Sequence, residues 1–236
     1  MSVKLQAPDL GYAPKGLFIG GGWQPAADGR TFPTINPSTM EKLGDVPAAG
    51  PGDVDRAVQA AKKAFKDWGR VPPKERATAL NKLADRIMAH ADELAMMDAV
   101  DSGNAVVGMR GDMTWTADSL RYFAGLLTEV KGETSSQGQR HLNFTRRQPY
   151  GVVGKINPFN HPFRFCAEKA AAPLAAGNTV VIKGSEQAPL SSLRLGELCD
   201  GIFPPGVVNI ITGDGAVGSA LVRHPDVHRI GFVGSV

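Results

Sequence analysis

The chain has 236 residues, of which 42% are hydrophobic, a content that allows one large domain with a substantial core. Its 26 basic and 23 acidic residues give a net charge of +3 and are spread along the sequence, unlike the clustered basic surface of a nucleic-acid-binding protein. The sequence shows neither a signal segment nor an apolar run of membrane-spanning length. We therefore expect a cytoplasmic protein with no membrane or nucleic-acid partner.

Short strands followed by helices are predicted for the first 130 residues. Residues 16–23 and 30–37 are punctuated by glycine and proline, which predicts short strands of an N-terminal hairpin laid over a larger body. Asp53 and Asp92 are expected to cap helices, since each precedes a stretch with helix-forming residues. The helices expected in chain order cover residues 53–68, a segment after Pro73, residues 93–100 and most of 104–130.

The second half of the chain predicts an open parallel sheet. Residues 131–138 are polar, and the alternation over residues 141–146 predicts an exposed edge strand that could pair with another chain. From Gly151 onward, apolar runs alternate with helical segments in the order β-α-β-α-β-α-β. The expected fold class is α/β: a Rossmann-like, doubly wound parallel sheet with flanking helices, a helical N-terminal half and small β-hairpin elements.

Residues 151–186 are the stretch around which the rest is organised. They predict a strand, a helix beginning at Pro162 and a second strand, which together make a right-handed βαβ unit. In open parallel sheets, ligands bind beyond the carboxyl ends of the strands. The polar residues 157–160 and 183–186 directly follow the two strands, so we expect them at that edge of the sheet.

Polar side chains at this edge have two interpretations each. Lys183, Ser185 and Glu186 offer a cation, a hydroxyl and a carboxylate for the ribose and phosphates of a nucleotide, or they form a solvated turn with an exposed ion pair. Asn160 could donate an amide N–H to a developing oxyanion, or it could be the N-cap of the following helix.

Residues 213–218 match the pattern G-x-G-x-x-G between a predicted strand and a predicted helix, the context of a dinucleotide-binding loop. The acidic residue that would bind the ribose after the next strand is missing near residues 231–233. Two interpretations therefore stay open, a pyrophosphate loop and glycines that serve a tight turn and close packing.

Cysteines and histidines show no catalytic or metal-binding pattern. Cys166 and Cys199 have no CxxC spacing, and no histidines lie at metal-ligand spacing, which argues against a disulfide scaffold or a metal site and fits a reducing compartment. Both cysteines lie in apolar, helix-like surroundings with nothing nearby to lower the thiol pKa. A buried structural role is therefore favoured over a nucleophilic one.

Several ordered motifs together resemble the N-terminal part of the NAD(P)-dependent aldehyde dehydrogenase superfamily. Residues 18–23 with 35–37 resemble that family's opening hairpin, and several signatures follow along the chain. They are Ile156-Asn157-Pro158-Phe159-Asn160 for the family's P-W-N, residues 173–180 for A-L-A-x-G-N, residues 183–186 for K-P-S-E, and residues 204–209, 213 and 231–235 for later motifs.

The resemblance implies that a cysteine thiolate attacks a small-molecule aldehyde, that hydride passes to NAD and that a glutamate activates water. It implies that Asn160 donates to the oxyanion and that Glu186 favours NAD, since a carboxylate there would repel the 2′-phosphate of NADP, which stays an alternative. The implied cofactor-binding residues are Ile156, Asn157, Pro158, Phe159, Lys183, Ser185, Glu186, Gly215, Gly218, Phe232, Gly234 and Ser235.

The resemblance also implies a division of the chain. Residues 1–130 would form the hairpin and helical part of the cofactor-binding domain, residues 131–148 an oligomerisation-type β segment, and residues 149–236 the Rossmann-like part. We expect the sequence to be truncated before the family's nucleophilic cysteine and catalytic glutamate. The full-length enzyme would then be a homo-oligomer, and this chain alone would be inactive.

Departures from the family pattern bear on the site. Because Gly184 replaces a proline, we expect a looser turn around Lys183 and Glu186 and a weaker hold on the cofactor. The other departures are Phe159 for tryptophan, and Val233 and Val236 for threonine. Three alternatives remain open: a non-catalytic nucleotide-binding or assembly remnant, an unstable fragment with an open sheet edge, and a related enzyme that uses an acyl phosphate or acyl-CoA.

Overall fold

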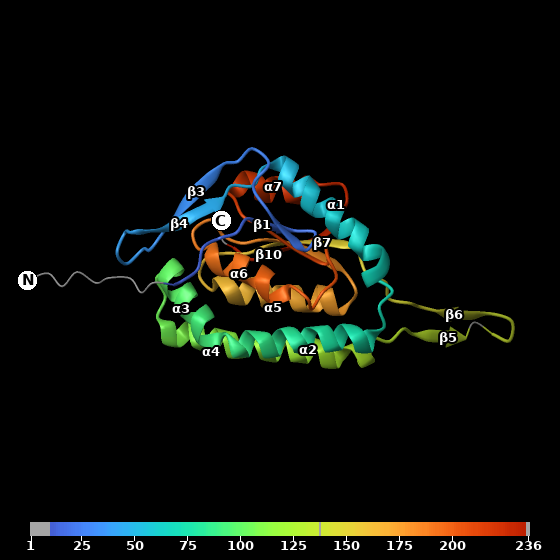
Figure 1. The fold of residues 1–236 in the computed structure, drawn as a ribbon. Helices are drawn as coiled ribbons and strands as arrows, with labels where there is room; N and C mark the ends of the chain where they lie inside the picture. The colour runs from blue at the N-terminus through green and yellow to red at the C-terminus, as the bar shows by residue number, and fades with distance from the viewer. Residues whose placement is uncertain (1–9, 137, 235–236) are drawn as a thin grey trace, which may run out of the picture.

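One six-stranded sheet forms the centre of the protein, as Figure 1 shows in the computed structural model, which describes residues 10–136 and 138–234. The strand order is β10-β7-β8-β9-β1-β2, and the first four of these strands are parallel. The predicted α/β fold class with a Rossmann-like parallel sheet is confirmed. The strands are β7 (Val152–Ile156), β8 (Thr179–Lys183), β9 (Val208–Ile211), β10 (Val227–Phe232), β1 (Leu17–Ile19) and β2 (Gly22–Gln24).

Helices cover both faces of the sheet, with a further helical layer on one side (Figure 1). α1 (Pro51–Trp68) and α7 (Gly215–Arg223) lie on one face. α5 (Pro162–Ala175) and α6 (Leu190–Cys199) lie on the other face. They separate the sheet from an outer layer of three helices, α2 (Pro73–Ala89), α3 (Ala91–Ser102) and α4 (Val106–Gly125). A short 3₁₀ helix, Leu126–Glu129, follows α4. Within the described parts of the chain, no helix is long and apolar enough to cross a bilayer.

Strand β8 shows how the two layers are joined, since all five of its residues are buried. Val180 and Ile182 belong to the apolar cluster under α5 and α6, whereas Val181 belongs to the cluster under α1 and α7. Successive side chains of a strand point to opposite faces, so a parallel strand covered on both sides has no polar face. This explains the uninterrupted apolar run that the sequence shows there.

The N-terminal strands differ from the predicted arrangement. Residues 16–23 already form a hairpin by themselves, β1–β2, which extends the main sheet because Phe18 pairs with Ile210 of β9. The buried Asn209 side chain also accepts a hydrogen bond from the Gly20 N–H, at 2.9 Å. The prediction of one hairpin laid over the body is therefore wrong. β3 (Thr31–Ile35) pairs instead with β4 (Lys42–Pro47), a strand that the sequence analysis missed.

Two helix starts lie earlier than predicted. α1 begins at Pro51, whose fixed φ suits the first helical position, and Gly50 is the N-cap. Asp53 is the third helical residue, and its carboxylate accepts the Gly50 N–H at 2.8 Å in the manner of a capping box. Similarly, α3 starts before Asp92, which lies in its first turn. Both aspartates lie at helix N-termini, but neither is the N-cap itself.

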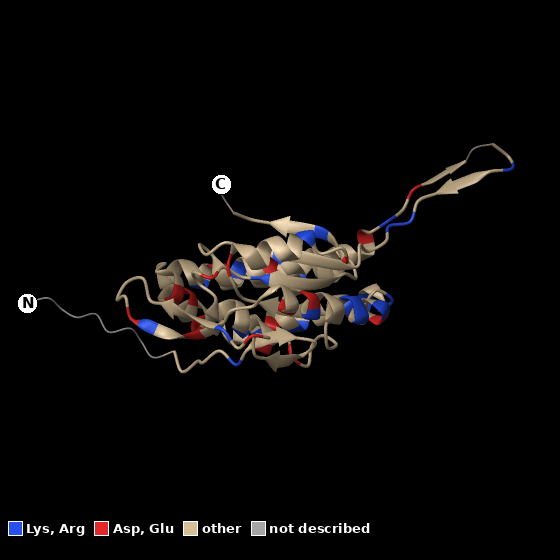
Figure 2. Ribbon diagram, turned by 90° about the horizontal axis from the view of Figure 1, so that it is seen from above, with Lys and Arg blue, Asp and Glu red and all other residues tan. Residues whose placement is uncertain are grey.

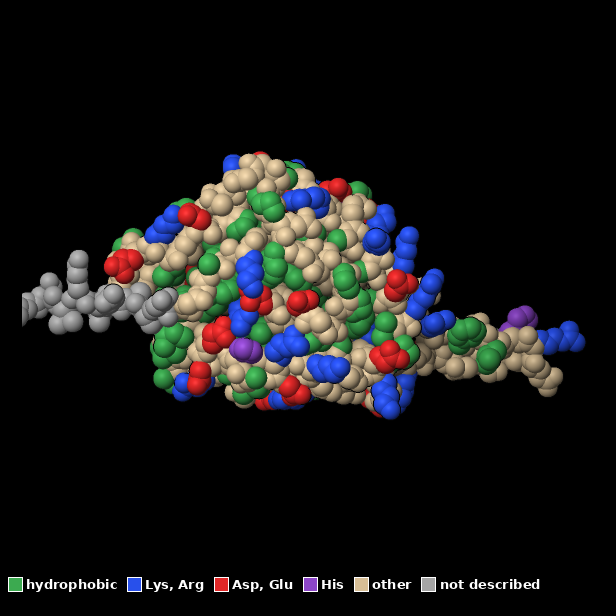
Figure 3. Space-filling model, viewed as in Figure 1, with side chains coloured by type: hydrophobic (Ala, Val, Ile, Leu, Met, Phe, Trp, Pro, Cys, Tyr) green, Lys and Arg blue, Asp and Glu red, His purple; other side chains and the backbone are tan. Residues whose placement is uncertain are grey.

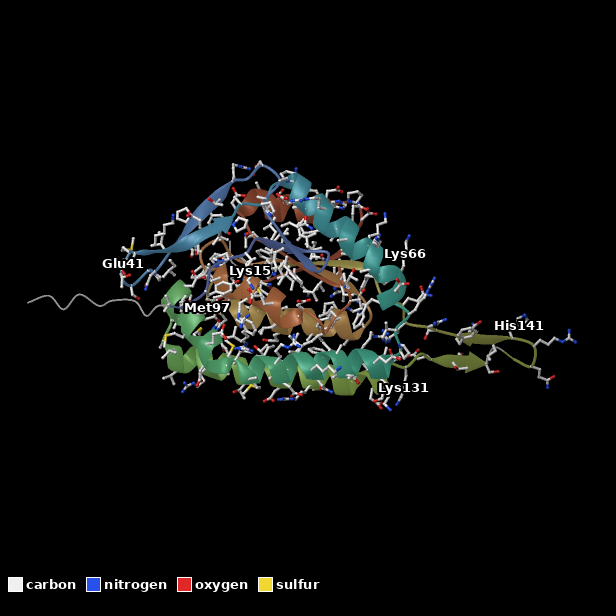
Figure 4. The ribbon with its side chains drawn as sticks, in the orientation of Figure 1. Lys15, Glu41, Lys66, Met97, Lys131 and His141 are labelled. Carbon is white, nitrogen blue, oxygen red and sulfur yellow. The ribbon has the colours of Figure 1, made fainter. Side chains whose placement is uncertain are left out.

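A hairpin projects from the body of the molecule, as Figures 1 and 2 both show. It consists of β5 (Thr134–Ser136), which the sequence analysis missed, and β6 (Leu142–Phe144), which lies within the predicted edge strand. Every residue of both strands is exposed. In Figure 4, Lys131 lies where the hairpin leaves the body and His141 lies out along it. Over the face shown in Figure 3, acidic and basic side chains are interspersed rather than segregated.

Two buried carboxylates on α3 connect the helical layer to the sheet. Asp98 Oδ2 accepts the N–H of Phe163, at the start of α5, at 3.2 Å. Asp101 Oδ2 accepts the N–H of Leu190, at the start of α6, at 2.9 Å. Burial raises the pKa of Asp98 from 3.8 to about 7 and that of Asp101 to about 6. Each side chain of α3 therefore accepts an N–H at the start of a neighbouring helix. Its ionised form is less stable in this buried position than in water.

Replacing Asp98 by asparagine should reduce the pH dependence of stability. A carboxyl whose pKa is higher in the folded state stabilises that state below its unfolded pKa and loses this contribution as pH rises through the folded pKa. At ~1.4 kcal/mol per pKa unit, we expect the wild-type free energy of unfolding to fall by a few kcal/mol between about pH 4 and pH 8. In Asp98→Asn, which cannot ionise but keeps an acceptor for the Phe163 N–H, this fall should be much smaller.

Denaturant unfolding followed by circular dichroism across this pH range measures the effect. Asp67→Asn, on the exposed side of α1, is the matched control and should leave the wild-type profile unchanged. Parallel profiles for wild type and Asp98→Asn would contradict the assignment of a raised pKa to Asp98.

Candidate functional site

The carboxyl ends of four parallel strands meet in one row. Ile156, the last residue of β7, pairs with Lys183 of β8 on one side and with Phe232 of β10 on the other. Lys183 in turn pairs with Ile211 of β9. The register thus brings together predicted site residues from three strands, at the edge where parallel sheets bind ligands.

Lys183 and Glu186 form an ion pair at this edge. The Lys183 side chain is only 6% exposed, and its Nζ lies 2.7 Å from Glu186 Oε2, while the Glu186 side chain is 42% exposed. Ser185 Oγ accepts the Gln187 N–H at 3.2 Å, which closes the turn. The interpretation as a solvated turn is therefore wrong for the cation, which is buried with its partner carboxylate facing solvent.

Gly184 of this turn packs closely against α6. A Cβ built on it would come within 2.7 Å of Ser192 Oγ and 2.9 Å of Ser192 Cβ on α6. Ser192 is itself buried, and its hydroxyl donates to the carbonyl of Pro189 at 2.7 Å. A side chain at this position would have to displace Ser192, so the close packing favours glycine here.

The loop between β7 and α5 holds the remaining predicted residues. Asn157 is buried, its N–H donates to the Lys183 carbonyl at 3.1 Å and its Nδ2 lies 3.6 Å from Cys166 Sγ, so it links the two strand ends. Pro158 is half-buried, whereas Phe159 and Asn160 are exposed. His161 rather than Asn160 is the N-cap of α5, so the alternative capping role of Asn160 is wrong.

A charged cluster beside this loop was missed by the sequence analysis. Asp112 of α4 lies with Oδ2 2.5 Å from His161 Nδ1 and with Oδ1 3.2 Å from the Arg164 guanidinium. The guanidinium of Arg164 also lies 4.8 Å from the centre of the Trp115 ring. Asp112 is 49 positions from His161 and 52 from Arg164, so no local pattern could have indicated the cluster.

The glycine-rich segment has mainly a structural role. Asp214 is the N-cap of α7 and accepts the Ala216 N–H at 2.9 Å. Gly213 has a positive φ of 148°, and a Cβ on it would lie 2.6 Å from a Val217 methyl carbon. A Cβ on Gly218 would lie 3.7 Å from the Ile156 side chain, so Gly218 adjoins the strand-end row, whereas Gly215 faces open space. The tight-turn interpretation is supported for Gly213.

Helix N-termini near this edge already have carboxylate partners. Asp98 serves α5, Asp101 serves α6 and Asp214 serves α7. A helix N-terminus binds an anion through its free N–H groups and its dipole, and a carboxylate placed there competes with a phosphate. A nucleotide at this edge would therefore depend on side chains, which agrees with the acidic residue missing after the G-x-G-x-x-G pattern.

The last predicted residues lie beside the loop. The Val233 N–H donates to the Ile156 carbonyl at 3.1 Å, which continues the pairing beyond β10. Phe232 is 63% exposed and Phe159 is 50% exposed, so two aromatic rings are accessible near this edge. Gly234 is exposed, and Ser235 lies outside the described residues.

Neither cysteine is arranged as a nucleophile. Cys166 and Cys199 are free thiols with exposed fractions of 1% and 3%. Burial raises the pKa of each thiol to about 12, so neither forms a thiolate near neutral pH. Among the described residues, no group of three His, Cys, Asp or Glu side chains comes together that could hold a metal ion.

Known proteins match this chain along almost all of its length. The model of the aldehyde dehydrogenase family matches residues 23–236. The aldehyde dehydrogenase tropH of Talaromyces stipitatus is 43% identical over 224 residues, and the match covers 93% of this chain and 43% of that protein. An aldehyde dehydrogenase of Aspergillus niger is also 43% identical, with 94% of this chain and 45% of that protein covered.

A solved structure gives the same result for the fold. The NAD+ complex of an aldehyde dehydrogenase from Bacillus cereus superposes with a TM-score of 0.92 at 40% identity, covering 96% of this chain and 47% of that one. The chain thus spans about half the length of the relatives it matches. Sequence and fold agree, and the chain belongs to the aldehyde dehydrogenase family.

Proposed function

We propose that this chain supplies the NAD-binding part, and the oxyanion donor, of an enzyme that oxidises an aldehyde to a carboxylic acid. The reaction consumes one aldehyde, one NAD+ and one water and yields a carboxylic acid, NADH and a proton. The observation that supports the proposal most is the buried Lys183 paired with the accessible Glu186 at the carboxyl edge of the sheet. The similar B. cereus enzyme was solved as an NAD+ complex.

The residues at this edge fit a dinucleotide without help from helix dipoles. Lys183 and Glu186 together offer a donor and an acceptor for vicinal ribose hydroxyls. The exposed rings of Phe159 and Phe232 offer flat apolar surface, and Gly218 leaves room beside Ile156. Nicotinamide supplies a hydride acceptor when bound, and the chain's own residues hold and orient it. Asn157, whose side-chain amide faces the interior, supports the site by joining the ends of β7 and β8.

Asn160 is the proposed oxyanion donor. Its side chain is exposed on the loop that follows β7, and the structure gives its amide no hydrogen-bond partner among the described residues. An amide N–H held near a carbonyl stabilises the negative charge that develops on oxygen as a nucleophile adds, an effect of about 10²–10³ in rate for one donor. The nucleophile itself is proposed to lie outside this chain, since both cysteines are buried and protonated.

A second candidate function is a non-catalytic nucleotide-binding module. It has the same strand-end site and the same affinity for NAD, but it would have no catalytic partner. The two candidates differ in whether a polypeptide that carries this chain together with a reactive cysteine oxidises aldehydes. Reading the encoding DNA beyond the codon of the last residue is the simplest observation that separates them.

Calorimetric titration of the purified chain with NAD should give saturable heat. Because Lys183 holds the ribose edge, Lys183→Met should weaken binding by about tenfold or more, equivalent to ~1.4 kcal/mol. Lys131→Met, at the base of the hairpin (Figure 4) in the same cleft as Tyr150, which precedes the amino end of β7, is the control and should leave affinity unchanged. A folded wild-type chain without saturable heat would contradict the proposal.

The same titration with NADP tests the role of Glu186. A carboxylate near the 2′-phosphate disfavours NADP by like-charge repulsion, so wild type should prefer NAD. Glu186→Gln removes the charge and should narrow the difference between the two cofactors. An unchanged ratio of affinities would show that Glu186 does not face the 2′ position.

The purified chain alone should form no NADH from an aldehyde. With both thiol pKa values near 12, neither cysteine offers a thiolate at neutral pH, and both should resist iodoacetamide until the protein is unfolded. Absorbance at the NADH band and mass spectrometry of alkylation measure the two effects. Aldehyde-dependent NADH formation that Cys166→Ala or Cys199→Ala abolishes would overturn this prediction.

The β5–β6 hairpin is proposed as a self-association surface. An isolated two-stranded hairpin is marginally stable in water, and here Leu142 and Phe144 are 65% and 72% exposed. A cleft of about 1010 Å³ opens at its base, lined by Arg146, Arg147 and Tyr150 among others. Pairing with the hairpin of a second copy would cover the edge strand.

Sedimentation velocity should show a concentration-dependent oligomer for the wild-type chain and a monomer for Phe144→Asp. Val107→Asp, which changes an equally exposed apolar residue on α4, controls for the added charge and should leave the oligomer intact. Identical sedimentation of wild type and Phe144→Asp would show that the hairpin is not part of the interface.

A further inference from the structure

The loop that carries Asn160 is held from the helical layer rather than from the sheet. Asn160 follows β7, but its backbone carbonyl is bound by Asn104, which lies in the turn between α3 and α4, 56 positions earlier. Asn104 Nδ2 donates to the Asn160 carbonyl oxygen at 2.8 Å. Within the described residues, this is the one side-chain hydrogen bond that reaches Asn160.

The amide of Asn104 is itself fixed in orientation. Its Nδ2 also donates to Ser102 Oγ at 2.9 Å, and that hydroxyl donates to the Asp98 carbonyl at 2.6 Å. A backbone carbonyl only accepts, so the group that faces Asn160 must be the NH₂ of Asn104 and not its oxygen. Both amide hydrogens are thereby used, and rotation of the side chain would break two hydrogen bonds.

Other contacts hold the residues that follow Asn160, but they do not involve Asn160 itself. Asp98 accepts the Phe163 N–H at 3.2 Å, and Asp112 lies 2.5 Å from the His161 ring. These contacts fix the start of α5. Without the hydrogen bond to its carbonyl, the ψ angle of Asn160 is set by fewer contacts, and an uncompensated change in ψ turns the Asn160 side chain relative to α5.

We infer that Asn104 is a positioning residue for Asn160: it fixes the Asn160 carbonyl so that the exposed amide side chain keeps one direction. The inference rests on the proposed role of Asn160 as oxyanion donor. Asn104 acts through this peptide group and touches neither Lys183 nor Glu186 in the structure, so it affects the direction of Asn160 and leaves cofactor binding alone. A donor aimed about 1 Å away from the oxyanion loses most of its effect on rate.

Asn104→Asp tests the inference with nearly the same side-chain shape. A carboxylate cannot donate to the Asn160 carbonyl and repels it, so the loop should be released. We expect the NMR order parameters of backbone amides 159–161 to fall from about 0.85 to below about 0.6. We also expect the NMR couplings that report the Asn160 χ1 angle to change from a single rotamer to an average. Asn104→Gln keeps the donor and should restore both readouts in part.

Two controls separate positioning from a general loss of stability. Asn143→Asp makes the same chemical change on the exposed hairpin and should alter neither readout. Amides of β8 and β9 should keep their protection in Asn104→Asp, since a merely destabilised protein would lose protection throughout. If Asn104→Asp does not fold, Ser102→Ala removes the hydroxyl that orients Asn104 and should give the same local change.

The outcomes distinguish this inference from the proposed function. Unchanged order parameters at residues 159–161 and unchanged χ1 couplings at Asn160 in Asn104→Asp would overturn the inference, whatever the affinity for NAD. A loss of order at residues 159–161 that comes with a loss of exchange protection in β8 would also overturn it, because the role would then be structural. A released loop in a chain that shows no NAD binding would keep the inference and contradict the proposed function alone.

Discussion

The rest of the structure depends on the contact between α3 and the starts of α5 and α6. Parallel strands need crossover helices, and each crossover helix begins with N–H groups that have no partner within the helix. In this protein two buried carboxylates, Asp98 and Asp101, provide those partners from a separate helical layer. The helical layer is therefore attached to the crossover helices at the edge of the sheet where ligands bind. These contacts help to position the loops at that edge.

This arrangement changes how the edge can bind an anion. In a dinucleotide fold with a glycine-rich fingerprint, a free helix N-terminus receives the pyrophosphate. Here α5, α6 and α7 each have an aspartate side chain that accepts a backbone N–H at the start of the helix, so fewer of these groups remain for an anion. The buried Lys183 is then a source of positive charge at the strand ends. Lys183 and Glu186 thus place at the strand ends the charged side chains that the segment after Gly218 lacks.

Much of the edge could be predicted because it depends on local patterns. Apolar runs ending at Ile156 and Lys183 predict strands, and polar residues just after parallel strands predict the side of the sheet on which they lie. The two strands that the sequence analysis did not predict have weak local patterns. β4 contains Gly44 and Pro47, and β5 is a polar Thr-Ser-Ser segment. Strands of this kind form because a partner strand is present, and that partner is not visible in the strand's own sequence.

The sequence by itself determined the α/β class, the order of helices and strands from Gly151 onward, and which side chains lie at the carboxyl ends of β7 and β8. Periodicity and connection rules are local or topological, so they can be read along the chain. Only the tertiary structure decided that Lys183 is buried, that Gly184 packs against Ser192 and that Asn104 holds the Asn160 carbonyl. These features depend on distances between residues far apart in sequence, and close packing in three dimensions sets such distances.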